Sequence, residues 1–317
     1  MLIMYAIKRI DDNSCQDIQT LYRLAFGAIY PITFIKSKYA TDIFGLKNVG
    51  VIAKDEKDQP AAYYGVFPII LEYNSKDYMV AQSGDTMTAP DHRKKGLFTK
   101  LAKGSYKLSK DLGIRMVFGF PNKNSYPGFK NKLDWVFTGH MYNFTLNVIT
   151  IPICELASKY KFLMPFYEKF AKKRLDKYKI SIQDINRETF TYKGSGVIGE
   201  IKKDYNFFKY KLNRRNTFLI KLNGYTLFIK IKPHLYIGAV NVIDKSKTKA
   251  LISTVKKLSR ELGCKKVIFT LSENHWLYDC LKEYLEPTKS LPIGFYMIDN
   301  YFKPEAIQFI SADYDTF

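Results

Sequence analysis

A short basic turn that contains glycine separates an expected strand from an expected helix in the first third of the chain. The strand covers residues 78–87, the turn is Asp-His-Arg-Lys-Lys-Gly at 91–96, and leucines follow at the helical positions 97, 101, 108 and 112. Such a turn leaves backbone N–H groups unpaired at the positive end of the helix dipole, and Gly96 lets a ligand approach the backbone closely. The arrangement therefore predicts a cradle for a phosphate or pyrophosphate group.

The chain around this turn continues to alternate strands and helices. Gly113 is expected to end the helix, residues 114–120 form a strand, and Pro-Asn-Lys-Asn-Ser at 121–125 forms a turn or a helix cap. Further strands are expected at 51–53 and 61–71, and a closing strand or hairpin at 135–148. The sequence thus predicts an α/β fold for this part of the chain.

With Arg93 and Gly96 in place, the turn resembles the acetyl-CoA signature Arg/Gln-x-x-Gly-x-Gly/Ala of the GNAT N-acetyltransferase superfamily. Phe98 departs from the last small position of that signature. The order of strand, basic turn, helix, strand and Asn-rich turn is also similar to the acyl-CoA-binding half of the superfamily, over residues 50–148. The resemblance implies an α/β fold of the α+β type, with a mixed, mostly antiparallel, twisted sheet flanked by helices.

An internal repeat suggests that the fold occurs twice. Residues 107–118 align with residues 257–268 without a gap, and six of the twelve positions are identical. We therefore predict a GNAT-like acyl-CoA-binding domain at 1–149, a connecting helical segment at 150–203 with a turn at Gly194-Ser195-Gly196, and a degenerate GNAT-like domain at 204–317. The stretch at 243–248 that corresponds to the basic turn contains no glycine, so the second copy is not expected to bind CoA. The arrangement is similar to tandem GNAT-like proteins of bacterial cell-surface polysaccharide loci.

The formal net charge of +20 raises the question of nucleic-acid binding, because basic surfaces release counterions from phosphates. Lysine accounts for 41 of the 50 basic residues and arginine for nine, and the lysines are spread along the chain. This is typical of a solvated surface and not of a reader of bases, which favours arginine. Nucleic acid is therefore disfavoured, and an acidic partner such as CoA, a nucleotide-sugar or an anionic membrane face stays as the alternative.

The densest basic segment, residues 159–179, mixes lysines with phenylalanines in the pattern of an amphipathic helix. We expect this helix to pack against the domain and consider peripheral membrane contact the less favoured interpretation. No apolar run is long enough to form a transmembrane segment and the first residues lack an apolar signal core, so a cytoplasmic protein is predicted. The four cysteines and four histidines lack metal-ligand spacing, so no metal is expected.

The resemblance implies an acyl-CoA-dependent N-acyltransferase that uses acetyl-CoA as its acyl-donor substrate. A primary amine on a small molecule, with an amino-sugar among the candidates, would attack the thioester directly in a ternary complex. The alternative is a catalytically weak or inactive acyl-CoA-binding scaffold or sensor.

The same resemblance assigns roles to residues along the expected cleft. Backbone amides of the turn would hold the CoA phosphates with help from the basic side chains, and the N–H groups of Met87 and Thr88 would face the pantetheine and the thioester oxygen. Asn122 or Asn124 would hold the pantetheine arm or would serve only as a helix cap. The turn residues in this group are Arg93, Lys94, Lys95, Gly96, Leu97 and Phe98.

Proton transfer needs a base for the incoming ammonium and an acid for the departing thiolate. Asp85 is the carboxylate best placed in sequence, just before the turn, to act as the base, or it hydrogen-bonds the turn as a structural residue. The family commonly places a tyrosine acid in the helix after the fifth strand, where Phe129 stands here. Tyr126 nearby, or solvent, would then supply the proton.

Overall fold

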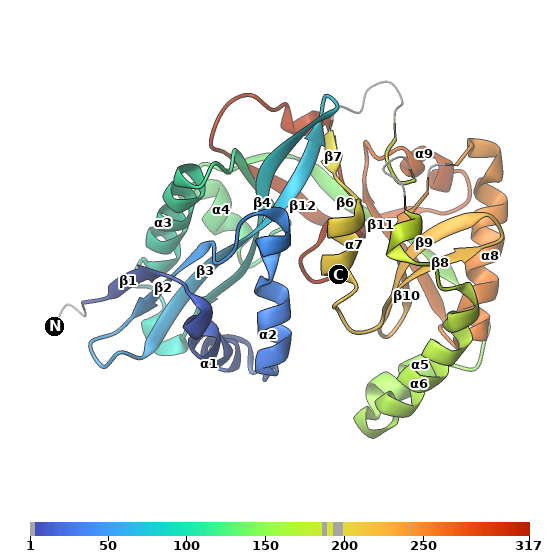
Figure 1. The fold of residues 1–317 in the computed structure, drawn as a ribbon, viewed down its shortest axis with the longest axis horizontal. Coiled ribbons are helices and arrows are strands. Elements are labelled where there is room, and N and C mark those ends of the chain that lie inside the picture. Colours follow the sequence, from blue (N-terminus) through green and yellow to red (C-terminus); the bar gives the residue numbers. More distant parts are fainter. Residues whose placement is uncertain (1–3, 186–188, 193–198, 242) are drawn as a thin grey trace. The chain divides into compact units, whose positions relative to one another are not determined.

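The computed structural model describes residues 4–185, 189–192, 199–241 and 243–317, so the turn expected at 194–196 lies outside the described residues. The chain forms two compact units (Figure 1). Unit 1 comprises Met1–Thr138 and Pro292–Pro304, and unit 2 comprises Gly139–Leu291 and Glu305–Phe317. These bounds differ from the division expected at residues 149 and 203.

Unit 1 is built on a mixed, mostly antiparallel sheet, as predicted. Its strand order is β1-β2-β3-β4-β5-β12, and within it only the β4–β5 pair is parallel. The strands are β1 (Ala6–Arg9), β2 (Gly50–Lys54), β3 (Pro60–Tyr73), β4 (Lys76–Thr88), β5 (Met116–Gly119) and β12 (Pro287–Met297). The helices are α1 (Cys15–Phe26), α2 (Ile32–Tyr39), α3 (Leu97–Asp111) and α4 (Tyr126–Lys132).

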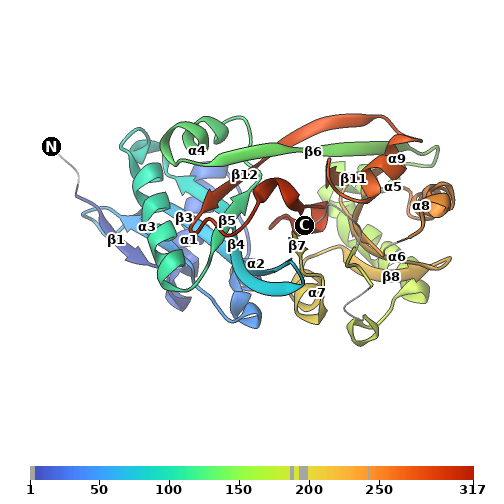
Figure 2. The same ribbon diagram turned by 90° about the horizontal axis from the view of Figure 1, so that it is seen from above.

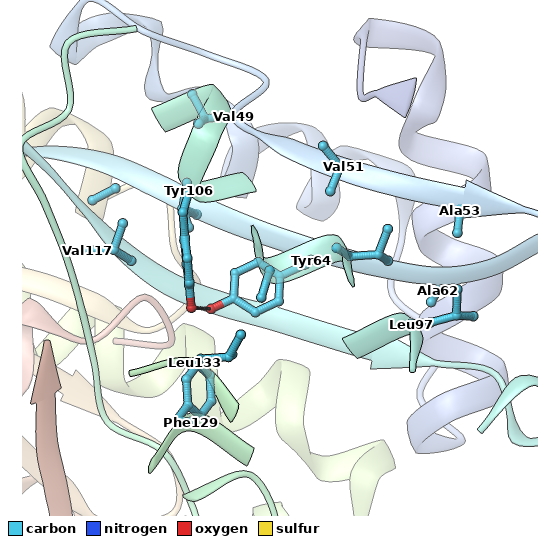
Figure 3. Close-up of a cluster of buried hydrophobic side chains, with 14 of the residues drawn as sticks. Val49, Val51, Ala53, Ala62, Tyr64, Leu97, Tyr106, Val117, Phe129 and Leu133 are labelled. Atoms are coloured by element: carbon cyan, nitrogen blue, oxygen red, sulfur yellow. Dashed lines mark hydrogen bonds between the residues drawn. The ribbon is translucent and has the colours of Figure 1, made fainter. Parts of the chain in front are cut away.

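Helices cover both faces of this sheet. Because successive side chains of a strand point to opposite faces, the neighbours Tyr63 and Tyr64 of β3 belong to two different core clusters. Tyr63 packs with residues of α1 and α2. Tyr64 packs with residues of α3 and α4 (Figure 3). Both tyrosine side chains are fully buried.

Unit 2 repeats this order of elements. Its sheet runs β6-β11-β10-β9-β8, and within it only the β10–β11 pair is parallel. The strands are β6 (Val136–Asn147), β8 (Thr217–Leu222), β9 (Tyr225–Ile231), β10 (Leu235–Val240) and β11 (Lys266–Ser272), and β7 (Gly199–Ile201) pairs with β13 (Ile307–Gln308). The helices are α5 (Ile153–Lys159), α6 (Met164–Leu175), α7 (Tyr205–Lys211), α8 (Thr248–Glu261) and α9 (Leu277–Lys282).

The repeated sequences adopt the same local structure. In the first, the N–H groups of Leu112, Gly113 and Ile114 donate to carbonyls at the end of α3. The N–H groups of residues 262–264 make the corresponding three bonds at the end of α8, and Gly113 and Gly263 both have positive φ, at 79° and 62°. The origin of unit 2 as a second GNAT-like copy stays a prediction, which this agreement supports.

The last strand of each unit explains why the bounds differ from the expected division. Strand β6, which follows α4 of unit 1, pairs with β11 of unit 2, and β12, which follows α9 of unit 2, pairs with β5 of unit 1. Each sheet is therefore completed by a strand from the other half of the sequence. Figure 2 shows both as long strands, within which the chain passes from one unit to the other.

No helix in the described part of the chain is both long enough and apolar enough to cross a membrane. The described residues also contain no group of three histidine, cysteine or acidic side chains that could hold a metal ion.

Candidate functional site

The basic turn opens α3 with a row of backbone N–H groups. Residues 90–92 form a short 3-10 turn, and Lys94 and Gly96 then adopt left-handed conformations with φ of 62° and 74°. The first helical bond is from the Lys100 N–H to the Gly96 carbonyl, at 3.1 Å. Among the described residues, the N–H groups of residues 94–99 have no hydrogen-bond partner. The turn thus presents donors that suit the phosphates of a ligand.

Two basic side chains hold the turn in shape. Arg93 Nε donates to the Thr88 carbonyl at 3.4 Å, and Lys95 Nζ donates to the Asp91 carbonyl at 2.8 Å. Arg93 therefore connects the turn to the end of β4. The side chains of Lys94 and Lys100 are exposed beside the free N–H groups, and their charges suit an anion.

Strands β4 and β5 separate next to this turn. Their parallel pairing covers Ala81↔Val117 and Gln82↔Phe118, whereas β4 continues to Thr88. The Ala89 N–H donates to the Ala61 carbonyl of β3. Because the N–H groups of successive residues in a strand point in opposite directions, the Met87 N–H also points to β3 and the Thr88 N–H points away from it. The Thr88 carbonyl, which points with its N–H, accepts the bond from Arg93. Of the two predicted positions, Thr88 has its N–H on the open side, and the Met87 side chain is buried in the core.

Leu97 and Phe98 anchor the start of the helix. Leu97 is buried in the core cluster of α3 and α4. The Phe98 ring lies 5.4 Å from the Phe129 ring, centroid to centroid, in an edge-on arrangement. A Cβ atom added at Gly128 would lie 2.8 Å from the Phe98 ring, so this glycine lets the ring pack directly against α4. The large Phe98, unexpected at a small position, thus joins the first turn of α3 to α4.

The Asn-rich turn leads directly into α4. Asn122 Oδ1 accepts from the N–H groups of Asn124 and Ser125 at 2.9 and 3.1 Å, and its carbonyl accepts from Tyr126. Asn122 therefore closes the turn that precedes α4, and the side chains of Asn122 and Asn124 remain exposed. Tyr126 begins α4 despite the following Pro127, and its ring lies 4.6 Å from that of Phe137.

Asp85 lies in a buried ion pair. Lys38 Nζ, from α2, is 2.5 Å from Asp85 Oδ1, and the Tyr39 hydroxyl donates to Oδ2 at 2.9 Å. The side chains of Lys38 and Asp85 are only 4% and 8% exposed. Burial, and then the nearby Asp85 charge, raise the pKa of Tyr39 well above its usual value, so Tyr39 stays protonated and donates. Asp85 has φ of 53°, at an irregularity in the pairing of β3 with β4.

A chain of hydroxyl groups runs from the strand opening into the core. Ser83, one residue beyond the last β4–β5 pair, bonds the Tyr64 hydroxyl at 2.8 Å. The Tyr64 hydroxyl in turn bonds that of Tyr106 in α3 at 2.8 Å (Figure 3). Trp135 Nε1 donates to the Tyr106 hydroxyl at 2.8 Å. Burial raises the pKa values of both tyrosines, so both stay protonated. Sequence reasoning missed this network, and no local pattern marks it, because its hydrogen-bonded partners are 19 to 42 residues apart.

The equivalent turn of unit 2 has a different structure. Asp244 Oδ1 accepts from the N–H and the hydroxyl of Ser246, at 2.8 and 2.6 Å, before α8 begins at Thr248. These bonds hold the pKa of Asp244 below its usual value. A carboxylate therefore stands where the basic turn of unit 1 offers free N–H groups, which disfavours a phosphate there.

Comparison with known proteins agrees with this geometry. A family model described as an acetyltransferase (GNAT) domain matches residues 6–138, which contain the turn and the strand opening. No curated protein sequence matches the chain.

Several solved structures share the fold. A probable N-acyltransferase of Enterococcus faecalis V583 is 11% identical with a TM-score of 0.61, over 96% of this chain and 73% of that one. Saccharomyces cerevisiae N-myristoyltransferase with bound myristoyl-CoA is 11% identical with a TM-score of 0.57, over 93% and 83%. A GCN5-related N-acetyltransferase of Kribbella flavida is 11% identical with a TM-score of 0.56, over 93% and 71%. The comparisons therefore show a GNAT acetyltransferase domain at residues 6–138 and a fold shared with these structures over most of the chain.

Proposed function

We propose that this protein is an acyl-CoA-dependent N-acyltransferase that transfers an acetyl group from acetyl-CoA to a primary amine. The observation that carries the proposal is the row of unpaired N–H groups at residues 94–99, beside the point where β4 leaves β5. The CoA pyrophosphate binds these N–H groups and the flanking lysines. The acceptor is a small-molecule amine, with an amino-sugar among the candidates.

The pantetheine arm and the thioester lie along the open edge of β4. The Thr88 N–H donates to the thioester oxygen and stabilises the negative charge that develops there when the amine nitrogen attacks the carbonyl carbon. Collapse of the tetrahedral intermediate forms the amide and breaks the carbon–sulfur bond. Asn122 or Asn124, whose side chains are exposed at the neighbouring turn, orients the pantetheine amide groups.

Asp85 and Tyr126 are the proposed proton-transfer groups. The Asp85 carboxylate accepts the proton of the ammonium, and Lys38 and Tyr39, which already bind this carboxylate, hold it in place. Tyr126, at the start of α4, donates a proton to the departing thiolate.

A second candidate function is acyl-CoA binding without transfer. Two observations favour it: the Asp85 carboxylate is engaged in its ion pair, and Phe129, at the family's tyrosine position, is buried and has no proton to give.

Calorimetric titration with acetyl-CoA tests the binding site, with two variants at the two ends of α3. Gly96→Glu places bulk and negative charge in the turn, and Gly113→Glu places the same group at the opposite end. Both glycines have positive φ and open space around the position of a Cβ atom, so backbone strain and added charge are matched. We expect wild type and Gly113→Glu to bind, and Gly96→Glu to bind at least tenfold more weakly, which is about 1.4 kcal/mol. Equal binding by the two variants would place the ligand elsewhere.

Release of CoA thiol in the presence of amino-sugars, polyamines and other amines tests the chemistry. We expect Asp85→Asn and Tyr126→Phe each to lower kcat by about 10²–10⁴ while acetyl-CoA affinity stays constant. Unchanged turnover in both variants would assign proton transfer to solvent. Acetyl-CoA binding by wild type without turnover on any amine would favour the binding protein.

A further inference from the structure

Large apolar side chains are exposed in one short stretch of the chain, residues 149–166 of unit 2. Ile149 is 94% exposed, Ile151 74%, Phe162 72% and Phe166 73%. With Leu156 and Tyr160 they make six of the fifteen large exposed apolar side chains of the described residues. Exposed apolar side chains that gather on a protein surface are typical of an interaction site.

Helix α6 has one packed side and one free side. Tyr167, Ala171 and Leu175, spaced by four residues, are buried and hold the helix on unit 2, as predicted for a packing helix. Phe166 and Phe170 lie on another side of the helix. Lys173 and Lys177 follow them at helical spacing. We call residues 162, 166, 170, 173, 174 and 177, which lie on α6 and on the short 3-10 turns at its two ends, the outer surface of α6.

A hollow of about 350 Å³ lies in this outer surface. Its lining is Phe170, Lys173, Arg174 and Lys177. The Arg174 guanidinium lies 5.4 Å from the centre of the Phe170 ring, and Lys177 Nζ is 3.6 Å from a Glu261 carboxylate oxygen. Among the described residues, Lys173 and Arg174 have no ion-pair partner. The hollow therefore combines an aromatic wall with cationic groups, which suits a phosphate ester that has an apolar neighbour.

The charge around the outer surface determines what kind of partner fits. Residues 159–179 contain eight lysines and arginines and two acidic residues, a net charge of +6. One of the two, Glu168, is already bound by Arg215 and Asn216. A second copy would bring the same positive charge against this surface, which disfavours self-association. An anionic surface with an apolar interior satisfies both the cations and the exposed phenylalanines.

We propose that the outer surface of α6 docks the protein on a membrane that carries anionic phospholipids. Phe162 and Phe166 enter the boundary between headgroups and acyl chains, where amphipathic helices bury their apolar side chains. Lys173, Arg174 and Lys177 bind lipid phosphates in the hollow. This docking is independent of the acyl-transfer proposal, and it would bring the chain to amine acceptors held at a membrane.

Flotation of the full chain with lipid vesicles tests the proposal. We expect binding to phosphatidylcholine vesicles that contain phosphatidylglycerol, weaker binding as salt is added, and little binding to phosphatidylcholine alone. The double variant Phe162→Ser/Phe166→Ser should lose binding to both kinds of vesicle. The double variant Lys173→Glu/Arg174→Glu should lower the partition coefficient on anionic vesicles at least about thirtyfold, since each surface cation contributes about 1 kcal/mol.

Matched controls separate docking from general effects of charge and hydrophobicity. Phe26→Ser/Ile29→Ser removes two exposed apolar side chains of unit 1, and Lys249→Glu/Lys257→Glu reverses two exposed charges of α8. Both should bind vesicles as wild type does, and thermal melting checks that every variant is folded. Binding that is absent in wild type, or equal in all variants, overturns the proposal. So does a dimer in gel filtration that dissociates in Phe162→Ser/Phe166→Ser, because a second copy would then cover the surface.

Discussion

At the scale of single residues, Asp85 illustrates how position in the chain and environment in the fold differ. Its place just before the basic turn favours the role of a base. Its partners Lys38 and Tyr39, however, lie in α2, 47 and 46 residues earlier in the chain. The buried pair with Lys38 compensates a charge that would otherwise be expensive in the core. The same contact fixes the residue whose left-handed backbone marks the irregular part of β4.

Replacing Lys38 should therefore destabilise the protein strongly. Lys38→Met leaves the Asp85 carboxylate buried with Tyr39 as its remaining partner in the pair, and we expect a loss of about 3–5 kcal/mol in the free energy of unfolding. The double variant Lys38→Met/Asp85→Asn, which removes both charges, should recover a large part of this loss. Urea unfolding of the three proteins measures it, and a loss below about 1 kcal/mol in the single variant would show that the pair is not important for stability.

At the scale of elements, α3 is bound to the sheet by polar as well as apolar contacts. Ser105 donates to the Tyr64 carbonyl at 2.9 Å, and Tyr106 bonds both the Tyr64 hydroxyl and Trp135 Nε1. The Tyr106 ring also stacks on Tyr296 of β12, with the ring centres 4.0 Å apart. The helix that opens with the basic turn is therefore held at its middle by a network on three strands and their loops.

Removing the Tyr106 hydroxyl, which is the central group of this network, should lower the free energy of unfolding. Tyr106→Phe leaves Trp135 Nε1 buried without its acceptor, and we expect a loss of about 1–3 kcal/mol in the free energy of unfolding. Tyr205→Phe, which removes the hydroxyl of a tyrosine that is 41% exposed, should change it by less than about 0.5 kcal/mol. Equal effects of the two substitutions would argue against a structural role for the network.

At the scale of the whole molecule, buried ionisable groups should make stability depend on pH. Glu200 of β7 is 8% exposed, and burial raises its pKa from 4.5 to about 7, although Lys203 opposes the shift. Its oxygens accept from the Tyr192 N–H and from Gln308 Nε2, at 3.2 and 2.7 Å. The Glu200 carboxyl keeps its proton to a higher pH in the folded state than in the unfolded state. The contribution of Glu200 to stability is therefore complete below pH 4.5 and is lost as the pH rises through 7.

Comparison with Glu200→Gln isolates this effect. Relative to the variant, the free energy of unfolding of wild type should fall by about 3 kcal/mol between pH 4.5 and pH 8, since one pKa unit corresponds to 1.36 kcal/mol. Other titrating groups, such as the buried His275 whose pKa is lowered to about 3, are present in both proteins and cancel. Urea unfolding at the two pH values gives the difference, and a constant difference would mean that Glu200 ionises alike in both states.

The sequence by itself determined the local architecture of the candidate site. The turn at 91–96, the start of α3 and the helix ends at Gly113 and Gly263 follow from short-range properties: the spacing of leucines, the freedom of glycine at positive φ and the lack of partners for the first N–H groups of a helix. These properties act over a few residues, so they can be read along the chain. The mixed, mostly antiparallel sheet was predicted by the same local patterns together with the family resemblance.

Only the tertiary structure decided which distant groups meet. The exchange of β6 and β12, the pairing of Asp85 with Lys38 and the hydroxyl chain from Ser83 to Trp135 join segments far apart in sequence. The exposure of Phe162 and Phe166 likewise depends on which side of α6 the rest of unit 2 covers. Periodicity shows that a helix has two sides, but packing, burial and long-range hydrogen bonding select the one that faces the core.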